Sequence, residues 1–299
     1  MSSRQATITE SGLISAREWQ HRRTAVTARV VQGIVLLGLI VAGLGPLAWL
    51  VAASLGTSQE IIRDPLGVFW SMGHWENYLD AFRGVDAGRL LLNTVLAAGG
   101  SAIATVVVSL SAGYVIAIMR PRWAPLLSAG VLATVFLPAV VSLVPLYLTV
   151  VDLFDTGISL QNTFWAVWLP AGANAFSVLL VTSYLRGLPR ELIEAASVDG
   201  AGPWRVMWSI VLPLSRPIFG VVALLAAIGA WKDYLWPSLV LTDPSLRPLS
   251  VALPLIEKTT DLSTFFAVLV IASLVPIALF LVFQRPLLAS ASLSAGMKD

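Results

Sequence analysis

The chain has 299 residues, of which 57% are hydrophobic and only 12% are charged, and its mean hydropathy is +0.82. This composition excludes an ordinary water-soluble domain and is typical of an integral membrane protein. The formal net charge is +2 and cysteine is absent, so disulfides and thiol chemistry are excluded as well. The sequence therefore predicts an all-α integral membrane protein.

Segments of about 20 apolar residues are long enough to cross a bilayer as helices. In chain order, six such segments are predicted to form transmembrane helices: 30–54, 90–119, 125–150, 163–184, 217–239 and 265–283. Lys232 and Asp233 interrupt the fifth segment near one end. An even number of spans places both chain termini on the same side of the membrane.

The ends of the chain are polar and are expected to lie outside the membrane. We expect an N-terminal lead at 1–29, a transmembrane domain at 30–287 and a C-terminal tail at 288–299. The lead is too long and polar for the start of a cleaved signal peptide, so the first span is predicted to remain. Within the lead, 11–29 either forms an interfacial helix anchored by Trp19 or is a loosely ordered tail.

Basic residues are distributed unequally between the two sides of the predicted membrane domain. Thirteen of the 19 lysines and arginines fall on the side of the termini: Arg4, Arg17, Arg22, Arg23, Arg29, Arg120, Arg122, Arg186, Arg190, Arg205, Arg216, Arg285 and Lys298. Since short cytoplasmic loops are enriched in Lys and Arg, both termini are predicted to be cytoplasmic in a bacterial plasma (inner) membrane. The long loop at about 186–216 lies on the same side.

Nucleotide binding by this chain is not supported. A phosphate-binding P-loop requires a Gly-Lys-Ser/Thr sequence. The only three lysines, Lys232, Lys258 and Lys298, follow tryptophan, glutamate and methionine. His21 and His74 lack metal-ligand spacing and no nucleophile–base pair is evident, so no catalytic residue, metal or cofactor is expected, and the chain is not predicted to be an enzyme.

The most informative segment lies between the fourth and fifth spans and reads EAASVDGAGPWRVMWSIVLP from Glu194 to Pro213. Pro189 opens a short predicted helix with acidic residues near its positive end. Gly200 provides a left-handed stop and Pro203 starts a second helix. The segment therefore predicts a stiff elbow of two helices.

The surface of this elbow suits contact with another protein. Ala195 and Ala196 are small enough to let a partner approach closely, while Glu191 and Glu194 offer negative charge to a basic partner. The alternative interpretation is an ordinary amphipathic loop between two spans.

A second group of residues could line a path for a solute. Charges inside the predicted spans are nearly absent, so a largely neutral, hydroxylated or amide-bearing solute is expected. The candidates are aromatic and polar residues of the fourth and fifth spans: Asn174, Ser177, Trp231, Asp233, Tyr234 and Trp236. The alternatives are interface anchoring by Trp and Tyr and hydrogen bonding between helices by Asn.

The spacing of the elbow resembles that of a known family. Glu-Ala-Ala, three residues, Gly, nine residues, Ile, one residue and Leu-Pro is similar to the cytoplasmic loop of permease subunits in binding-protein-dependent ABC importers, and all seven positions are filled. Weaker similarities over about 35–299 point to the carbohydrate-uptake branch, near the smaller subunit of maltose- and glycerol-phosphate-type systems. They are Glu76-Asn77-Tyr78, Asn93-Thr94, Trp231–Pro237, Phe283-Gln284-Arg285 and Gly296-Met297-Lys298.

The resemblance implies a type I ABC importer permease fold that forms half of a translocation pore for a sugar, polyol or sugar phosphate. It implies four kinds of partner: a second homologous permease subunit, two ATPase subunits or a dimeric ATPase that binds ATP and Mg, an extracytoplasmic solute-binding protein, and the lipid membrane. A nucleic-acid partner is not expected. The residues that would contact the ATPase are Glu191, Glu194, Ala195, Ala196, Asp199 and Gly200.

Two other functions compete with this interpretation. One is an importer permease for another class of solute, such as amino acids, peptides or metals. The other is a secondary carrier or channel, which is disfavoured because a proton- or sodium-coupled carrier usually needs ionisable groups deep in the membrane.

Overall fold

The computed structural model describes residues 22–296, and this part of the chain is helical without strands. Three helices are long and apolar enough to cross a membrane. They are α1 (Arg22–Ser54), α4 (Ala87–Tyr114), which continues into a π-helical segment at Val115–Met119, and α15 (Leu262–Gly296). The prediction of an all-α protein with membrane-spanning helices is confirmed for the described residues.

Three further spans would each consist of a bent pair of helices, so that up to six spans are present by length and composition. The first pair is α5 (Ala124–Val135) with α6 (Ala139–Val151), bent by 111°. The second is α7 (Trp165–Gly172) with α8 (Ala175–Arg186), bent by 47°. In the third pair, Pro203–Leu214 meets α12 (Arg216–Lys232) at 77°.

The breaks have local causes in the sequence. Pro138 has no N–H to continue a helix and takes an extended conformation between α5 and α6. Asn174 is also extended, and its side chain caps α8 by accepting a hydrogen bond of 2.8 Å from the backbone N–H of Ser177. Pro46 and Pro145, by contrast, lie inside continuous helices, so only some prolines bend a span.

The structure divides three predicted spans, of which 125–150 is broken at Pro138 between α5 and α6. The segment 163–184 is divided at Ala173–Asn174 rather than continuous, because Asn174 begins a new helix. In 217–239, α12 ends at Lys232, and α13 (Leu235–Val240) follows after a break at Asp233 and Tyr234. Polar residues thus end the fifth helix where the sequence interrupts its apolar run.

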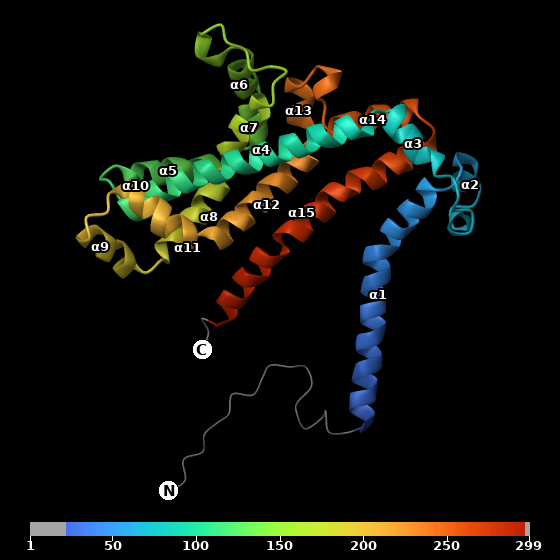
Figure 1. Ribbon diagram of the computed structural model, residues 1–299, viewed down its shortest axis with the longest axis horizontal. Coiled ribbons are helices and arrows are strands. Elements are labelled where there is room, and N and C mark those ends of the chain that lie inside the picture. Colours follow the sequence, from blue (N-terminus) through green and yellow to red (C-terminus); the bar gives the residue numbers. More distant parts are fainter. Residues whose placement is uncertain (1–21, 297–299) are drawn as a thin grey trace.

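Shorter helices connect the long ones at the two ends of the bundle. At one end lie α2 (Ser58–Arg63), α3 (Glu76–Arg83) and α14 (Leu249–Thr259). At the other end lie α9 (Arg190–Val198), α10 (Pro203–Val206) and α11 (Leu212–Leu214). Figure 1 shows these two sets at opposite ends of α4, which runs through the centre of the bundle beside α12, α7 and α8.

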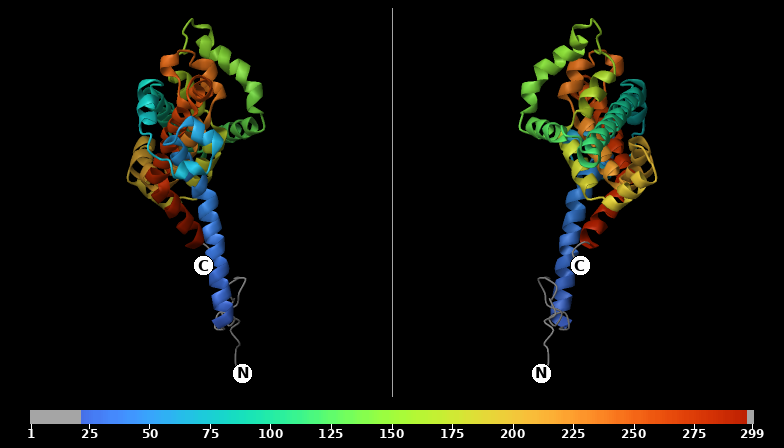
Figure 2. Two further views of the ribbon diagram at one scale, coloured as in Figure 1. Left: turned by 90° about the vertical axis from the view of Figure 1, so that its right-hand side faces the viewer. Right: turned by 90° about the vertical axis from the view of Figure 1, so that its left-hand side faces the viewer.

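Helix α1 stands apart from the bundle. Its last turns pack against the start of α15, where Trp49 meets the ring of Phe266 edge-on at 5.3 Å between centroids. From Val26 to Gly45, nearly all of its described side chains are exposed. The side views in Figure 2 show α1 extending beyond the other helices.

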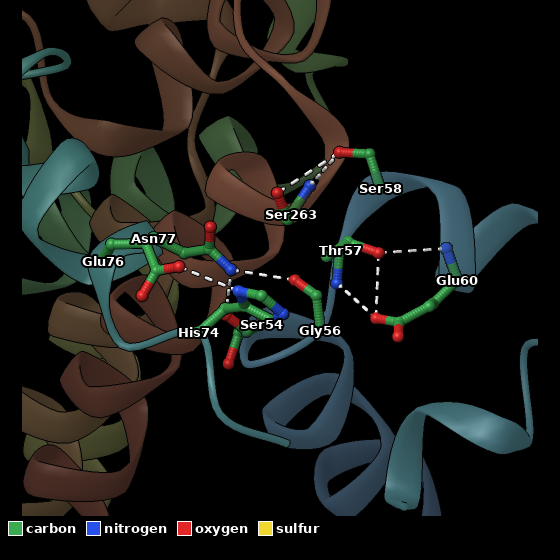
Figure 3. A network of polar contacts seen from close by, with 9 residues as sticks. All are labelled: Ser54, Gly56, Thr57, Ser58, Glu60, His74, Glu76, Asn77 and Ser263. Atoms are coloured by element: carbon green, nitrogen blue, oxygen red, sulfur yellow. Dashed lines mark hydrogen bonds and ion pairs between the residues drawn. The ribbon is translucent and has the colours of Figure 1, made fainter. Parts of the chain in front are cut away.

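A polar network fixes the junction between α1, α2, α3 and α15 (Figure 3). The Asn77 side chain donates hydrogen bonds to the backbone oxygens of Ser54 and Gly56 at 3.0 and 2.9 Å. Hydrogen bonds from Thr57 hold the pKa of the Glu60 carboxyl below its usual value in a capping box. These contacts rigidify the turn that follows the first span.

The same network contains one histidine–carboxylate pair. His74 Nδ1 lies 2.8 Å from Glu76 Oε1, and this hydrogen bond lowers the pKa of Glu76. Ser58 and Ser263 lie 3.2 Å apart between their hydroxyl oxygens and join α2 to α15. These contacts connect three elements that are close in sequence, α1, α2 and α3, to the distant helix α15.

Small residues let neighbouring helices approach α4 closely. A Cβ atom on Gly100 would overlap the indole of Trp168 from α7, whose Nε1 donates a 3.0 Å hydrogen bond to the Leu96 carbonyl. At Gly113, an added Cβ would lie 3.0 Å from Val181 of α8. Since helix association in lipid depends on close van der Waals packing, these glycines hold the bundle together.

We expect Gly100→Leu to destabilise the bundle by about 1–3 kcal/mol, because the new side chain must displace Trp168. Thermal unfolding of the detergent-purified protein measures the effect. The matched control is Gly99→Leu, because no heavy atom lies within 4 Å of a Cβ at that neighbouring position. Equal stability of the two variants would contradict the packing argument.

Candidate functional site

The first candidate site is the elbow between α8 and α12. Helix α9 ends with a Schellman arrangement, in which the N–H groups of Gly200 and Ala201 donate to the carbonyls of Ser197 and Ala196 at 3.1 and 2.9 Å. Gly200 has φ +75°, a left-handed conformation that other residues adopt at a cost. The predicted glycine stop is confirmed, and Pro203 begins α10 as expected.

Hydrogen bonds and apolar contacts connect the elbow to the bundle. The Tyr114 hydroxyl of α4 donates to the Pro203 carbonyl at 2.8 Å, and the Tyr184 hydroxyl of α8 donates to the Leu214 carbonyl at 2.9 Å. Between these points, the π-helical segment Met207–Val211 packs into a core cluster with α4, α8 and α12. The first leg packs against the same cluster through Leu188, Ile193 and Ala196, so both legs of the elbow are held against the bundle.

Three acidic side chains of the elbow face outward. Glu191, Glu194 and Asp199 are exposed, and none forms an ion pair within 4.0 Å in the part of the chain that the structure describes. Their carboxylates are therefore available to a partner. Glu194 also borders a small cavity of about 180 Å³ together with Arg190.

The two alanines of the elbow differ in their surroundings. Ala195 is exposed, whereas Ala196 is half-buried and packs against the core cluster at the base of the elbow. Of the two, Ala195 offers the more accessible surface for close contact with another protein.

Sequence reasoning missed two apolar residues of the elbow. Val198, two residues before Gly200, is 88% exposed, and Trp204, four residues after it, is 72% exposed. Exposed apolar side chains beside charged ones are typical of protein interaction surfaces. The sequence feature that could have identified them is an apolar residue on each side of the turn, at positions where a loop exposed to solvent usually has polar residues.

The second candidate site is a pocket of about 470 Å³ within the bundle. Residues of α4, α7, α8, α12 and α13 contribute to its walls. Four of the six predicted pathway residues line it: Asn174, Ser177, Asp233 and Trp236. The other two, Trp231 and Tyr234, are not among its lining residues, and Tyr234 is half-exposed.

Some of the hydrogen-bonding groups in this pocket already bond to other parts of the chain. The Asn174 side-chain oxygen caps α8, and the Trp236 indole donates to the Ala166 carbonyl at 2.9 Å. Asp233 Oδ1 accepts from the Trp236 backbone N–H at 3.3 Å, while its second carboxylate oxygen makes no hydrogen bond to the described residues. Asp233 is thus held by the helix break with one oxygen left for a ligand.

Two residues of α4 complete the polar wall, and sequence reasoning did not select them as pathway residues. Thr105 donates to the carbonyls of Ser101 and Ala171, at 2.7 and 3.0 Å. Ser101 is fully buried, and its hydroxyl has no partner among the described residues. Their spacing of four residues on one helix face was the available signal, but the small residues around them made that face look like packing alone.

Two asparagines near one end of the bundle, Asn93 and Asn162, make hydrogen bonds that serve the fold. Asn93 donates to the backbone carbonyls of Ser245 and Arg247, at 2.9 and 3.1 Å. Asn162 accepts from the Thr242 hydroxyl at 3.1 Å and from the Asp243 N–H at 2.8 Å. Both residues thus join segments that are distant in the sequence.

Apolar spanning helices, a polar pocket between them and an anchored elbow at one end define a multi-pass membrane protein of the permease class. The family model described as binding-protein-dependent transport system inner membrane component matches residues 90–290. The chain therefore belongs to this family.

Relatives of known description agree with the family. The sn-glycerol-3-phosphate transport system permease protein UgpE of Agrobacterium fabrum is 31% identical, over 86% of this chain and 94% of its own. The diacetylchitobiose uptake system permease protein NgcG of Streptomyces coelicolor is 28% identical, over 83% and 82%. The sulfoquinovosyl glycerol transport system permease protein SmoH of Agrobacterium fabrum is 28% identical, over 87% and 90%.

The fold is shared with a solved structure. A chain of a bacterial ABC transporter involved in the import of the acidic polysaccharide alginate superimposes with a TM-score of 0.74, covering 88% of this chain and 97% of its own at 19% identity. The predicted resemblance to ABC importer permeases of the carbohydrate-uptake branch is confirmed by these comparisons.

Proposed function

We propose that the chain forms half of the translocation pathway of an ATP-driven importer for a sugar or a related polyol or sugar phosphate. The observation that carries this proposal is the elbow, which presents exposed apolar side chains and carboxylates without an ion pair among the described residues, while both its legs are held against the bundle. Such a surface can receive a motion from a partner ATPase and transmit it to the spanning helices. The family membership supports the same interpretation.

The solute would pass the polar pocket. The Asp233 carboxylate suits hydroxyl groups of a neutral carbohydrate, because one of its oxygens makes no hydrogen bond to the described residues. Hydroxyl-bearing solutes also agree with the names of the relatives, which are described as transporting glycerol phosphate, diacetylchitobiose and sulfoquinovosyl glycerol.

The remaining partners follow from the proposed architecture. A second homologous permease subunit would complete the pore, a pair of ATPase domains would bind ATP and Mg, and an extracytoplasmic binding protein would deliver the solute. In this arrangement the chain would cross a bacterial inner membrane six times, with the elbow and both termini on the cytoplasmic side. The ATPase would then have access to Glu194. Arg120 and Arg122 flank the start of α5 at the elbow end, as the positive-inside rule requires for this orientation.

The proposal is tested by purifying the tagged chain from its host in mild detergent and identifying the proteins that accompany it. We expect a P-loop ATPase and a second permease subunit. Glu194→Arg should reduce recovery of the ATPase at least about tenfold, because it replaces an attraction by a repulsion at a contact. Glu257→Arg, which changes an exposed helical glutamate at the opposite end, is the matched control.

The class of solute is tested on the solute-binding protein of the same system. Binding of a sugar, polyol or sugar phosphate by that protein supports the proposed cargo, and binding of an amino acid, peptide or metal supports the alternative. A chain that purifies without an ATPase and moves solute in liposomes without ATP would instead be a secondary carrier.

A further inference from the structure

A cavity of about 750 Å³ lies next to the elbow and outside the pocket already described. Its walls come from the end of the π-helical segment at Val115–Met119, the start of α5 and the end of α8. These are the ends of three membrane-spanning segments, so the cavity lies at the boundary between membrane and water. It opens on the same end of the bundle as the elbow, since Arg120 and Arg186 line both this cavity and the smaller one beside Glu194.

Three arginines converge on the cavity, and no acidic residue lines it. Arg120 and Arg122 lie in the turn that precedes α5, and Arg186 is the last residue of α8. In the described part of the chain, none of them forms an ion pair within 4.0 Å. Positive charges gathered without a counter-charge repel one another, and an anion in the cavity would relieve that repulsion.

The backbone holds one of these side chains in place. Arg120 has a left-handed conformation with φ +48°, and its Nε donates a 2.7 Å hydrogen bond to the Ala117 carbonyl. The two terminal nitrogens of its guanidinium make no hydrogen bond to the described residues. A guanidinium fixed through Nε still offers two parallel donors, which is the geometry that binds a phosphate through two oxygens.

Apart from Ser128, the rest of the cavity is lined by apolar residues and follows a spanning helix. Pro125, Ala129 and Leu132 lie on successive turns of α5 and line the wall that leads away from the arginines. A free inorganic anion would not contact this apolar wall. A molecule with an anionic head group and a hydrocarbon tail would contact both the arginines and the wall. Basic pockets at the ends of spanning helices favour anionic lipid head groups for the same reason.

We propose that this cavity binds the phosphate group of an anionic phospholipid, with the head group held by Arg120, Arg122 and Arg186 and an acyl chain lying along α5. The bound lipid would be next to the elbow, because two of its three arginines also border the cavity at Glu194. Occupancy would then fix the position of α9 relative to α8. This inference depends on the membrane-spanning fold and is independent of the cargo.

The test uses the full chain, purified with its accompanying subunits, in nanodiscs that contain phosphatidylglycerol or phosphatidylcholine. Native mass spectrometry counts the lipids retained by the protein. We expect selective retention of phosphatidylglycerol and a decrease of about tenfold or more in the R120Q/R122Q/R186Q variant, because charge-assisted hydrogen bonds to phosphate are lost. R63Q/R83Q/K258Q removes the same charge at the opposite end and should retain the lipid like the parent.

A second variant separates lipid binding from general effects of charge. Ser128→Phe projects into the cavity and leaves all three arginines in place, so it should also expel the lipid, with thermal unfolding like that of the parent. Equal retention of the two lipids, or unchanged retention in R120Q/R122Q/R186Q, would overturn the proposal.

Two further outcomes would assign the arginines to other ligands and also overturn it. Displacement of all retained lipid by inorganic phosphate, with direct binding of that ion in lipid-free detergent, would identify a site for soluble phosphate. Loss of the accompanying ATPase from R120Q/R122Q/R186Q with unchanged lipid retention would identify a protein contact.

Discussion

Gly200→Pro is expected to abolish transport while the protein still inserts into the membrane. Proline fixes φ near −65°, whereas Gly200 has φ +75°, so the chain cannot make the same turn. The substitution also removes the N–H that donates to the Ser197 carbonyl at 3.1 Å. A cost of about 3 kcal/mol would lower the population of the native elbow by about a hundredfold. Solute uptake in cells and recovery of the ATPase measure the effect.

The neighbouring glycine provides the control for this prediction. Gly202 has φ −69°, which proline adopts without strain, and its N–H makes no hydrogen bond in the described structure. Gly202→Pro should therefore transport like the parent. Gly200→Ala should be intermediate, since its only cost is the left-handed backbone, about 1–2 kcal/mol, and no heavy atom lies within 4 Å of the added Cβ. Parent-like transport by Gly200→Pro would refute the coupling role of the elbow.

Gly229→Phe is expected to reduce transport at least about tenfold and to leave the complex assembled. Gly229 lines the polar pocket, and a Cβ at this position meets no heavy atom within 4 Å. The phenylalanine ring would therefore fill part of the pocket without displacing neighbouring side chains. Loss of productive binding geometry commonly costs orders of magnitude in rate. Uptake of labelled solute and recovery of the ATPase are measured together.

The matched control for the pocket is Gly38→Phe. Gly38 lies on the exposed part of α1, and its Cβ would also meet nothing within 4 Å. It therefore adds the same ring to a spanning helix at a distance from the pocket and should leave uptake unchanged. If both variants transported like the parent, the pocket at Asp233 would not be part of the solute pathway.

The elbow was predictable from the sequence because its determinants are local. These determinants are a glycine with φ > 0, a proline at a helix start and the fixed spacing between them. Each acts over a few residues and can be recognised in the amino-acid sequence. The exposed state of Val198 and Trp204 was not visible, because side-chain exposure depends on how the whole elbow packs against α4 and α8.

The solute pocket was predictable only in part. Polarity within apolar spans pointed to Asn174, Ser177, Asp233 and Trp236, which the fold brings together. The same criterion also selected Trp231 and Tyr234, which lie on the same short stretch but do not line the pocket. The helix break at Asp233 changes the direction in which neighbouring side chains point. The sequence predicts that the apolar run is interrupted there, but it does not predict which way those side chains point.

The sequence by itself determined the membrane setting, the helical class, the family and the place of the elbow. Hydrophobic length and charge distribution fix these properties independently of which helix meets which, because lipid enforces internal backbone hydrogen bonding on every span. Only the tertiary structure decided that α7 and α8 are two helices meeting at Asn174, that Ser101 and Asp233 line one pocket, and that Arg186 of α8 shares a cavity with Arg120 and Arg122 of the turn before α5. Those facts depend on the angles at which distant segments pack, and such angles arise from side-chain shapes that meet only in the folded protein.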